Sequence, residues 1–276
     1  MPDVQRSDVG WNAARAAQFF DEYGAREWSR FDDGRTPGAS LDIHIRMLER
    51  FVRPDDLVLD AGAGPGRFTI ELARLGAEVV ALDISPLQLD LNRENVTNAG
   101  FEASVRERMV ADVLDLSRLP DASFDMTVCY GGPVSYVAEH TDDALAELAR
   151  VTRPGGHLLV SVMTLAGALT HYLPLLLDLA RRDGISKQDE IVRTGLLPDD
   201  PDYGHLRMKL FRWDELERSL ERFGRVVAAA AAGLLPDDVD LDPELRAFVR
   251  RTDLALSEDP GVVGCGLHTI AVVEIA

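Results

Sequence analysis

Residues 57–73 read Leu-Val-Leu-Asp-Ala-Gly-Ala-Gly-Pro-Gly-Arg-Phe-Thr-Ile-Glu-Leu-Ala and form the clearest motif of the chain. A short apolar run ends at Asp60, and glycines follow at alternate positions, Gly62, Gly64 and Gly66, before an amphipathic helical pattern begins. Glycine lets the backbone turn sharply and lets a ligand approach the main chain, while the first turn of a helix offers unpaired N–H groups. The stretch therefore predicts a strand, a tight ligand-binding turn and a helix.

The glycine spacing discriminates between classes of nucleotide site. A dinucleotide fingerprint, G-x-G-x-x-G, needs a glycine where Arg67 stands, and a phosphate-binding P-loop needs a Gly-Lys-Ser/Thr ending that is absent. The pattern Asp60-x-Gly62-x-Gly64-x-Gly66 instead resembles the first motif of the class I S-adenosylmethionine-dependent methyltransferases. A purely structural turn is the alternative interpretation, and the residues that follow bear on the choice.

An acidic residue closes the next apolar run, Glu78–Asp83. At the carboxyl end of a second parallel strand, the Asp83 carboxylate can accept hydrogen bonds from both ribose hydroxyls of a nucleotide. The alternative role is that of a helix N-cap or dipole partner, but Ser85-Pro86 is the better helix start. We therefore predict that Asp83 binds ribose.

The third and fourth strands supply further candidates. A strand at Val105 to Val110 leads into Asp112 and Val113, and the resemblance implies that Asp112 accepts from the adenine amino group while the Val113 backbone N–H meets a ring nitrogen. Ile84, after the second strand, and Tyr130, after the fourth, are candidate cofactor contacts as well. In such sheets the ligand crevice lies at the carboxyl ends of the strands, where their order reverses.

The resemblance implies an α/β fold, a Rossmann-like doubly wound seven-stranded sheet, mostly parallel with an antiparallel last strand. Its strand order begins 3-2-1-4-5, and the segment Arg150 to Val162, with Pro154-Gly155-Gly156 as the turn before strand five, matches many small-molecule members. We expect a single domain over 1–276, divided into a helical cap, a cofactor-binding core, a lid insertion and the C-terminal part of the sheet: 1–53, 54–163, 164–210 and 211–276.

The cap and the lid hold the weaker candidates. The segment Phe20-Asp21-Glu22-Tyr23 resembles the helix that caps the cofactor in this family, which makes Tyr23 a minor candidate beside its more ordinary role in packing. The lid is expected to cover the acceptor site, and it contains His205, our candidate general base, although a histidine in such a loop is usually solvated or structural. The lid's other candidate side chains are His171, Tyr172, Tyr203 and Arg207.

Composition limits the partners. The net charge of −18 argues against a polyanionic partner, because nucleic-acid binding requires phosphates to be neutralised by Lys and Arg. The cysteines, Cys129 and Cys265, fit a reducing compartment, and no His/Cys cluster has zinc spacing. No apolar run approaches the roughly 20 residues of a membrane helix, and the N-terminus lacks a signal-peptide layout. We expect a cytoplasmic protein without a metal, a membrane partner or a nucleic-acid partner.

The favoured function is transfer of a methyl group from S-adenosyl-L-methionine to an oxygen or nitrogen of a small-molecule acceptor. No Asp-Pro-Pro-Tyr motif is present, and Cys129 follows Val128 rather than a proline, which disfavours methylation of nucleic-acid bases. Two alternatives remain open: a non-catalytic S-adenosylmethionine-binding module, or an RNA or protein methyltransferase. The last requires a basic patch built from arginines such as Arg150, Arg153, Arg181, Arg182 and Arg207. The acceptor and the oligomeric state are left open.

Overall fold

The computed structural model describes residues 10–29, 39–200, 204–235 and 242–276. Its main sheet has seven strands in the order β3-β2-β1-β4-β5-β9-β8. The strands are β1 (Leu57–Ala61), β2 (Glu78–Asp83), β3 (Val105–Val110), β4 (Phe124–Cys129), β5 (Thr152–Met163), β8 (Gly224–Ala232) and β9 (His268–Ile275). The first five strands are parallel, and β9 runs antiparallel to both neighbours, which confirms the predicted fold class.

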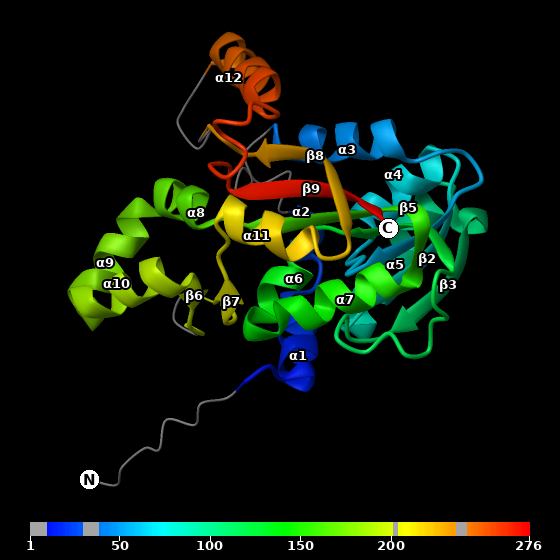
Figure 1. The fold of residues 1–276 in the computed structure, drawn as a ribbon, viewed down its shortest axis with the longest axis horizontal. Coiled ribbons are helices and arrows are strands. Elements are labelled where there is room, and N and C mark those ends of the chain that lie inside the picture. The colour runs from blue at the N-terminus through cyan, green and yellow to red at the C-terminus, as the bar shows by residue number, and fades with distance from the viewer. Residues whose placement is uncertain (1–9, 30–38, 201–203, 236–241) are drawn as a thin grey trace, which may run out of the picture.

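Helices cover both faces of this sheet (Figure 1). On one face α3 (Ser40–Phe51) and α4 (Arg67–Arg74) pack against apolar residues of β1 and β9, with α5 (Pro86–Asn98) next to α4. On the other face α7 (Thr141–Val151) and α11 (Trp213–Leu220) bury their apolar stripes. Because both faces are covered, the central strands carry nearly continuous apolar runs, as parallel sheets do.

The Pro-Gly-Gly segment differs from the prediction in detail. We expected the turn to come before strand five, but β5 begins at Thr152 and contains the segment as a bulge. Phe124 pairs with Thr152 and Met126 pairs with His157, so four residues of β5 stand opposite a single residue of β4. The hydroxyls of Thr152 and Thr127 are hydrogen-bonded at 2.7 Å, which ties the early part of β5 to the sheet.

The insertion after β5, expected as a lid at residues 164–210, is largely helical. The chain forms α8 (Leu165–His171), α9 (Leu173–Asp183) and α10 (Ile185–Thr194), then a hairpin of β6 (Leu196–Leu197) and β7 (Met208–Lys209). Pro174 lies in the first turn of α9, where proline is tolerated, and the helix breaks just before it. In Figure 1 these helices project beyond one end of the sheet.

Shorter elements complete the chain. The segment expected as a helical cap contains α1 (Ala13–Tyr23) and α2 (Arg26–Ser29), which are separated at Gly24, a residue with a positive φ of 55°. The remaining elements are α6 (Pro133–Tyr136), α12 (Pro243–Leu256) and the 3₁₀ helices Glu102–Ser104 and Ala138–His140. Among the described residues, no helix is long and apolar enough to span a membrane.

Candidate active site

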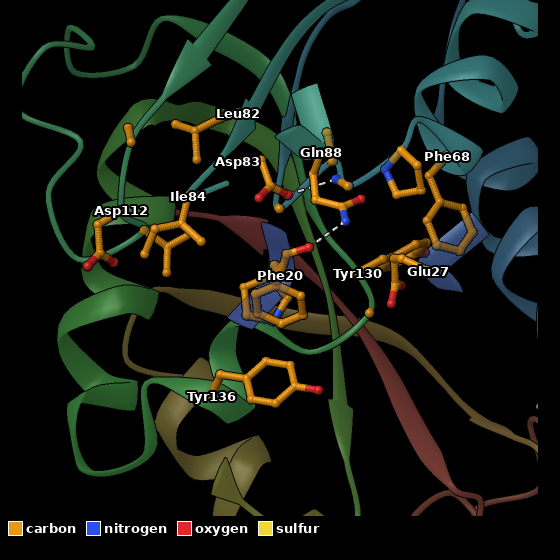
Figure 2. Close-up of a pocket in the computed structure, with 18 of the residues that line it drawn as sticks. Phe20, Glu27, Phe68, Leu82, Asp83, Ile84, Gln88, Asp112, Tyr130 and Tyr136 are labelled. Atoms are coloured by element: carbon orange, nitrogen blue, oxygen red, sulfur yellow. Dashed lines mark hydrogen bonds between the residues drawn. The ribbon is translucent and has the colours of Figure 1, made fainter. Parts of the chain in front are cut away.

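A cavity opens at the carboxyl ends of the first four strands. Its walls come from the glycine turn, from the residues that follow β2, β3 and β4, and from the N-terminal helices. Figure 2 shows Asp83, Ile84 and Asp112 on one side of the cavity and Phe68 and Tyr130 on the other. The strand order reverses between β1 and β4, so this is where a doubly wound sheet binds its ligand.

The glycine turn presents main chain to the cavity. Gly62, Gly64 and Gly66 have φ values of 80°, 50° and 95°, which L side chains rarely adopt. A Cβ on Gly62 would lie 2.3 Å from Pro133 Cγ, so the turn depends on glycine there. Gly62 and Gly64 line the cavity, whereas Gly66 caps α4 and lies close to Asn92. The backbone of Gly66 lets α4 start, and its direct contact with a cofactor stays a prediction.

Asp83 lies at the end of β2 and faces the cavity. Its Oδ2 accepts from the Gly64 N–H at 2.8 Å, and its Oδ1 accepts from the Ser85 N–H at 2.9 Å. Burial raises the pKa of Asp83 to about 6, against the effect of these hydrogen bonds, and the nearby charge of Glu27 adds to the increase. The helix-cap role belongs to Ser85, whose hydroxyl accepts from the Gln88 N–H. Asp83 thus keeps lone pairs for a ligand.

Asp112 reaches the same cavity from the loop after β3. Its Oδ1 accepts from the Leu114 N–H at 3.0 Å, and its Oδ2 accepts from the Trp11 indole Nε1–H at 2.6 Å. Val113, the next residue, is buried and also lines the cavity. The two positions predicted for adenine recognition are therefore brought together with Asp83.

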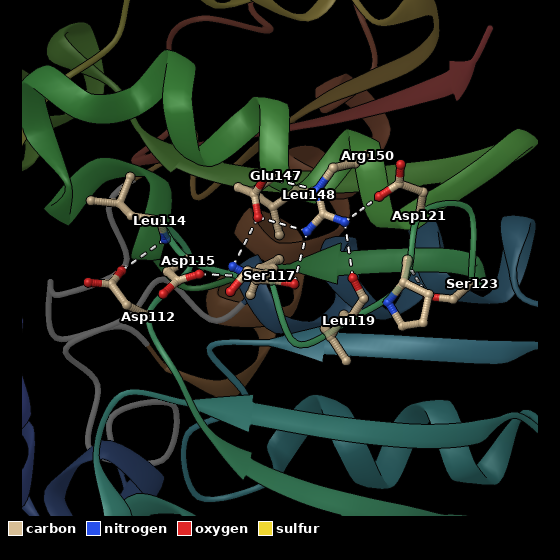
Figure 3. A network of polar contacts seen from close by, with 12 residues as sticks. Asp112, Leu114, Asp115, Ser117, Leu119, Asp121, Ser123, Glu147, Leu148 and Arg150 are labelled. Carbon is tan, nitrogen blue, oxygen red and sulfur yellow. Dashed lines mark hydrogen bonds and ion pairs between the residues drawn. The ribbon is translucent and has the colours of Figure 1, made fainter.

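Arg150 on α7 holds the loop that carries Asp112 (Figure 3). Its guanidinium donates to the carbonyls of Leu116 and Leu119 at 2.9 and 3.0 Å and pairs with Glu147. Glu147 in turn accepts from the Leu116 N–H. Arg150 and Glu147 thus fix the loop after β3 to α7.

Asp60, the first acid of the glycine motif, does not reach the cavity in the described chain. It is 1% exposed, and its Oδ2 accepts from the Thr69 hydroxyl at 2.6 Å, which ties β1 to α4. Burial raises the pKa of Asp60 to about 7. The geometry gives Asp60 a supporting position behind the turn, and its direct contact with a cofactor stays a prediction.

Tyr130 and Ile84 both line the cavity, as predicted. The Tyr130 ring meets the rings of Phe68 and His44 edge-on, with centroids 5.1 and 4.8 Å away. Burial raises the pKa of the Tyr130 phenol well above its usual value, so the hydroxyl stays neutral. This hydroxyl is buried and has no hydrogen-bond partner in the described part of the chain.

The N-terminal segment and its helices supply cavity residues that were not predicted from the sequence. Trp11, Phe20 and Glu27 line the cavity, and Gln88 Nε2 donates to the carbonyl of Phe20 at 2.9 Å (Figure 2). Tyr23, the minor candidate, instead stacks on Phe19 with centroids 6.0 Å apart. The helical pattern and its aromatic residues were visible in the sequence, but the side of the helix that faces the cavity was not.

The structure does not bring His205 to this cavity. Its Nδ1 lies 3.2 Å from the carbonyl of Leu206, and its backbone pairs with Asp200 in an isolated bridge. His171 Nε2 donates to the carbonyl of Gly233 at 2.9 Å, while Tyr203 lies outside the described residues. No group of His, Cys, Asp and Glu residues suited to a metal ion occurs where the structure describes the chain.

Comparison with known proteins decides the family. Residues 58–156 match the sequence model of a family described as a methyltransferase domain. A magnesium-protoporphyrin O-methyltransferase from Rhodobacter capsulatus is 31% identical over 159 residues, which cover 53% of this chain and 68% of that protein. The chain belongs to the S-adenosylmethionine-dependent methyltransferases. S-adenosylmethionine is the cofactor of this family and therefore the expected ligand of the cavity.

A second relative and a solved structure of the same fold are named for different acceptors. A ribosomal protein L11 methyltransferase from Symbiobacterium thermophilum is 31% identical over 150 residues, or 51% of this chain and 46% of that protein. The Burkholderia thailandensis 1,6-didemethyltoxoflavin N1-methyltransferase, solved with its acceptor and S-adenosylhomocysteine, aligns with a TM-score of 0.58. At 18% identity over 100% of this chain and 98% of that chain, it supports the fold alone. The matched part of this chain covers less than half the length of the Symbiobacterium protein.

The cavity of this methyltransferase fits the cofactor by its polar groups. Bare main chain at Gly62 and Gly64 adjoins the carboxylate of Asp83, and a second carboxylate, Asp112, lies on the same side. Gln88 Oε1 is buried at this cavity without a hydrogen-bond partner among the described residues. An unpaired buried acceptor is costly, and a hydroxyl or amino group of a bound nucleoside can satisfy it.

Proposed function

We propose that this methyltransferase transfers the methyl group of S-adenosylmethionine to an oxygen or nitrogen atom of a small-molecule acceptor. A surface that binds nucleic acid would need unpaired arginines. The proposal rests on the observation that the five candidate arginines are instead paired with carboxylates. Each of the five pairs with a carboxylate: Arg150 with Glu147 and Asp121, Arg153 with Asp125, Arg181 with Asp178, Arg182 with Asp183 and Asp200, and Arg207 with Glu139. These positive charges are compensated locally, which disfavours phosphate binding.

The relatives alone do not choose the acceptor. The Rhodobacter and Burkholderia proteins are named for small molecules, and the Symbiobacterium protein is named for a ribosomal protein. The acidic surface and the arginine pairs of this chain disfavour RNA as the acceptor. The enclosure of the site disfavours a folded protein as the acceptor.

The enclosure comes from contacts between the N-terminal helices and the insertion at residues 164–210, which we propose as the lid. Arg15 on α1 pairs with Asp199 of the insertion at 2.5 Å. Arg207 of the insertion pairs with Glu139, close behind α6. A second, smaller hollow lies between these elements and shares Trp11 and Tyr136 with the main cavity. The site is thus closed over by two elements, which supports a small acceptor.

The proposed chemistry needs little from the protein beyond placement. S-adenosylmethionine supplies an already activated methyl group on a sulfonium. We propose that Asp83 holds the ribose, that Asp112 and the Val113 N–H read the adenine, and that Gly62 and Gly64 present main-chain groups. Alignment of two reactants accounts for about 7–11 kcal/mol of a barrier in well-oriented systems. Phe20 and Tyr136, whose rings meet at 5.4 Å, contribute by keeping water from the site.

The test is the fate of a labelled methyl group. Purified protein is incubated with methyl-labelled S-adenosylmethionine and a cell extract that has been separated by ultrafiltration into small metabolites and macromolecules. We expect label in the small-metabolite fraction, with mass spectrometry identifying an O- or N-methylated product. Asp83→Ala serves as the matched control, because it removes the proposed ribose contact from the same cavity.

The proposal is contradicted if the label enters RNA or protein and not the small metabolites. It is also contradicted if a folded protein that binds S-adenosylhomocysteine labels neither fraction, which would favour the binding-module alternative. Labelling by Asp83→Ala at the wild-type rate, at cofactor concentrations that do not saturate the site, would remove Asp83 from the proposed site.

A further inference from the structure

We propose that Trp11 determines the specificity of the cofactor site for a 6-aminopurine by positioning the carboxylate of Asp112. The inference rests on the proposed adenine-binding role of Asp112, and the experiment below separates the two. Trp11 comes from the segment before α1, so it is 101 residues away from Asp112 in the sequence. Nothing in the glycine motif or in the acids after the strands points to it.

The geometry fixes both oxygens of this carboxylate. The Trp11 indole Nε1–H donates to Oδ2 at 2.6 Å, and the Leu114 N–H donates to Oδ1 at 3.0 Å. Each carboxylate oxygen has about two acceptor sites, so each keeps one for a ligand after these bonds are made. The carboxylate cannot rotate without losing one of the two hydrogen bonds.

The indole itself is held in place. Trp11 packs against the hydrophobic core that contains Val113 and Val137, and it lines both the main cavity and the hollow beside it. On the other side of Asp112, Arg150 fixes the loop through the carbonyls of Leu116 and Leu119 (Figure 3). Asp112 is thus constrained from the N-terminal segment and from its own loop.

The chemistry of the base explains why orientation matters. The 6-amino group of adenine donates hydrogen bonds, and an ionised carboxylate only accepts them. A 6-oxopurine presents an oxygen at the same place, so two acceptors would face each other in a partly buried site. A site built to bond a ligand N–H rejects an analogue that lacks it more strongly than a hydrophobic pocket rejects a missing methylene. Trp11 would keep the open acceptor sites of Asp112 directed at the base.

The experiment compares two ligands that differ at position 6 of the purine. Wild type, Trp11→Phe, Asp112→Asn and the double variant are titrated calorimetrically with S-adenosylhomocysteine and S-inosylhomocysteine. Trp11→Phe keeps an aromatic ring and removes the N–H donor. We expect it to weaken S-adenosylhomocysteine about 5- to 20-fold, with a smaller loss for the inosine analogue. In the double variant, adding Trp11→Phe should cost little beyond Asp112→Asn, since Trp11 acts through Asp112.

The control variant is Trp213→Phe, which changes a tryptophan of α11 that lies outside the cavity lining, and it should bind both ligands like wild type. The inference is overturned if Trp11→Phe, shown to be folded by its melting curve, binds both ligands normally or loses affinity equally for both. Unchanged discrimination in Asp112→Asn would overturn the adenine role of Asp112 together with the inference. Discrimination lost in Asp112→Asn but kept in Trp11→Phe would remove Trp11 alone.

Discussion

Among single residues, Asp83 is the one that we propose to hold the ribose of the cofactor. Its two oxygens are anchored by the N–H groups of Gly64 and Ser85, so its position does not depend on the ligand. Hydrogen bonds to a charged group are worth about 1.5–3 kcal/mol. We expect Asp83→Ala to weaken S-adenosylhomocysteine by about 10- to 150-fold in calorimetry. Unchanged affinity in the folded variant would rule out the ribose contact.

The pKa of Asp83 predicts a pH dependence of cofactor affinity. Burial raises this pKa to about 6, so in the free protein the carboxyl group loses its proton between pH 5 and pH 7. Ribose hydroxyls donate to the ionised form, and binding therefore strengthens as the pH rises through this window, by about tenfold. The Kd of S-adenosylhomocysteine measured from pH 5 to pH 7 checks this. Asp83→Asn should abolish the trend, and the same slope in both proteins would contradict the assignment.

For His205 we predict little effect on catalysis. A general base typically contributes about 10²- to 10⁴-fold to a rate, but the structure places His205 outside the cavity. We therefore expect His205→Ala to change kcat by no more than about threefold once the acceptor is known. A hundredfold loss of kcat with unchanged cofactor affinity would restore His205 as the base.

Residues at the ends of strands could be predicted, and residues of the cap could not. The carboxyl ends of parallel strands meet at one edge of a sheet, so Asp83, Asp112 and Tyr130 converge once the strand order is known. Phe20 and Tyr23 lie three positions apart on an aromatic helix, and only the docking of α1 decides that Phe20 faces the cavity. Trp11 precedes that helix, where no periodic pattern applies.

At the scale of elements, the loop after β3 depends on its clamp to α7. Arg150 bonds two loop carbonyls and two carboxylates while its side chain is 27% exposed. We expect Arg150→Ala to lower the free energy of unfolding by about 1–3 kcal/mol, because the loop carbonyls lose a charged donor. Cofactor affinity should fall as well, since the same loop carries Asp112.

Urea unfolding and calorimetry together test this prediction. Arg153→Ala is the matched control: Arg153 is more exposed and pairs only with Asp125 among the ion pairs assigned in the described chain, so a loss below about 0.5 kcal/mol is expected. Equal effects of the two substitutions would show that the clamp on the loop adds nothing beyond a surface ion pair.

The lid insertion shows where element prediction failed. The segment 185–194 is largely polar, with Ile185 and Val192 exposed, so its pattern gave little sign of α10. Its fold depends on a small separate core in which Ile191 packs with Leu165 and Met208. Such tertiary contacts between distant residues override a weak local pattern, and the sequence alone does not reveal them.

For the whole molecule, the resemblance carried by the ordered motifs implied the sheet, and its strand order 3-2-1-4-5 was confirmed. The antiparallel position of β9 came from the family resemblance and was confirmed. The net charge of −18 argues against a polyanionic partner. The pairing of the arginines with carboxylates supports that proposal.

Calorimetric titration of the purified protein with S-adenosylmethionine, S-adenosylhomocysteine and NADH at matched salt shows whether the cavity at the carboxyl ends of the strands is an S-adenosylmethionine site. We expect both sulfur nucleosides to bind near one-to-one stoichiometry with micromolar affinity, weakened by Asp83→Ala, and NADH not to bind. Binding of NADH, or no binding of either sulfur nucleoside by the folded protein, would show that the cavity is not an S-adenosylmethionine site.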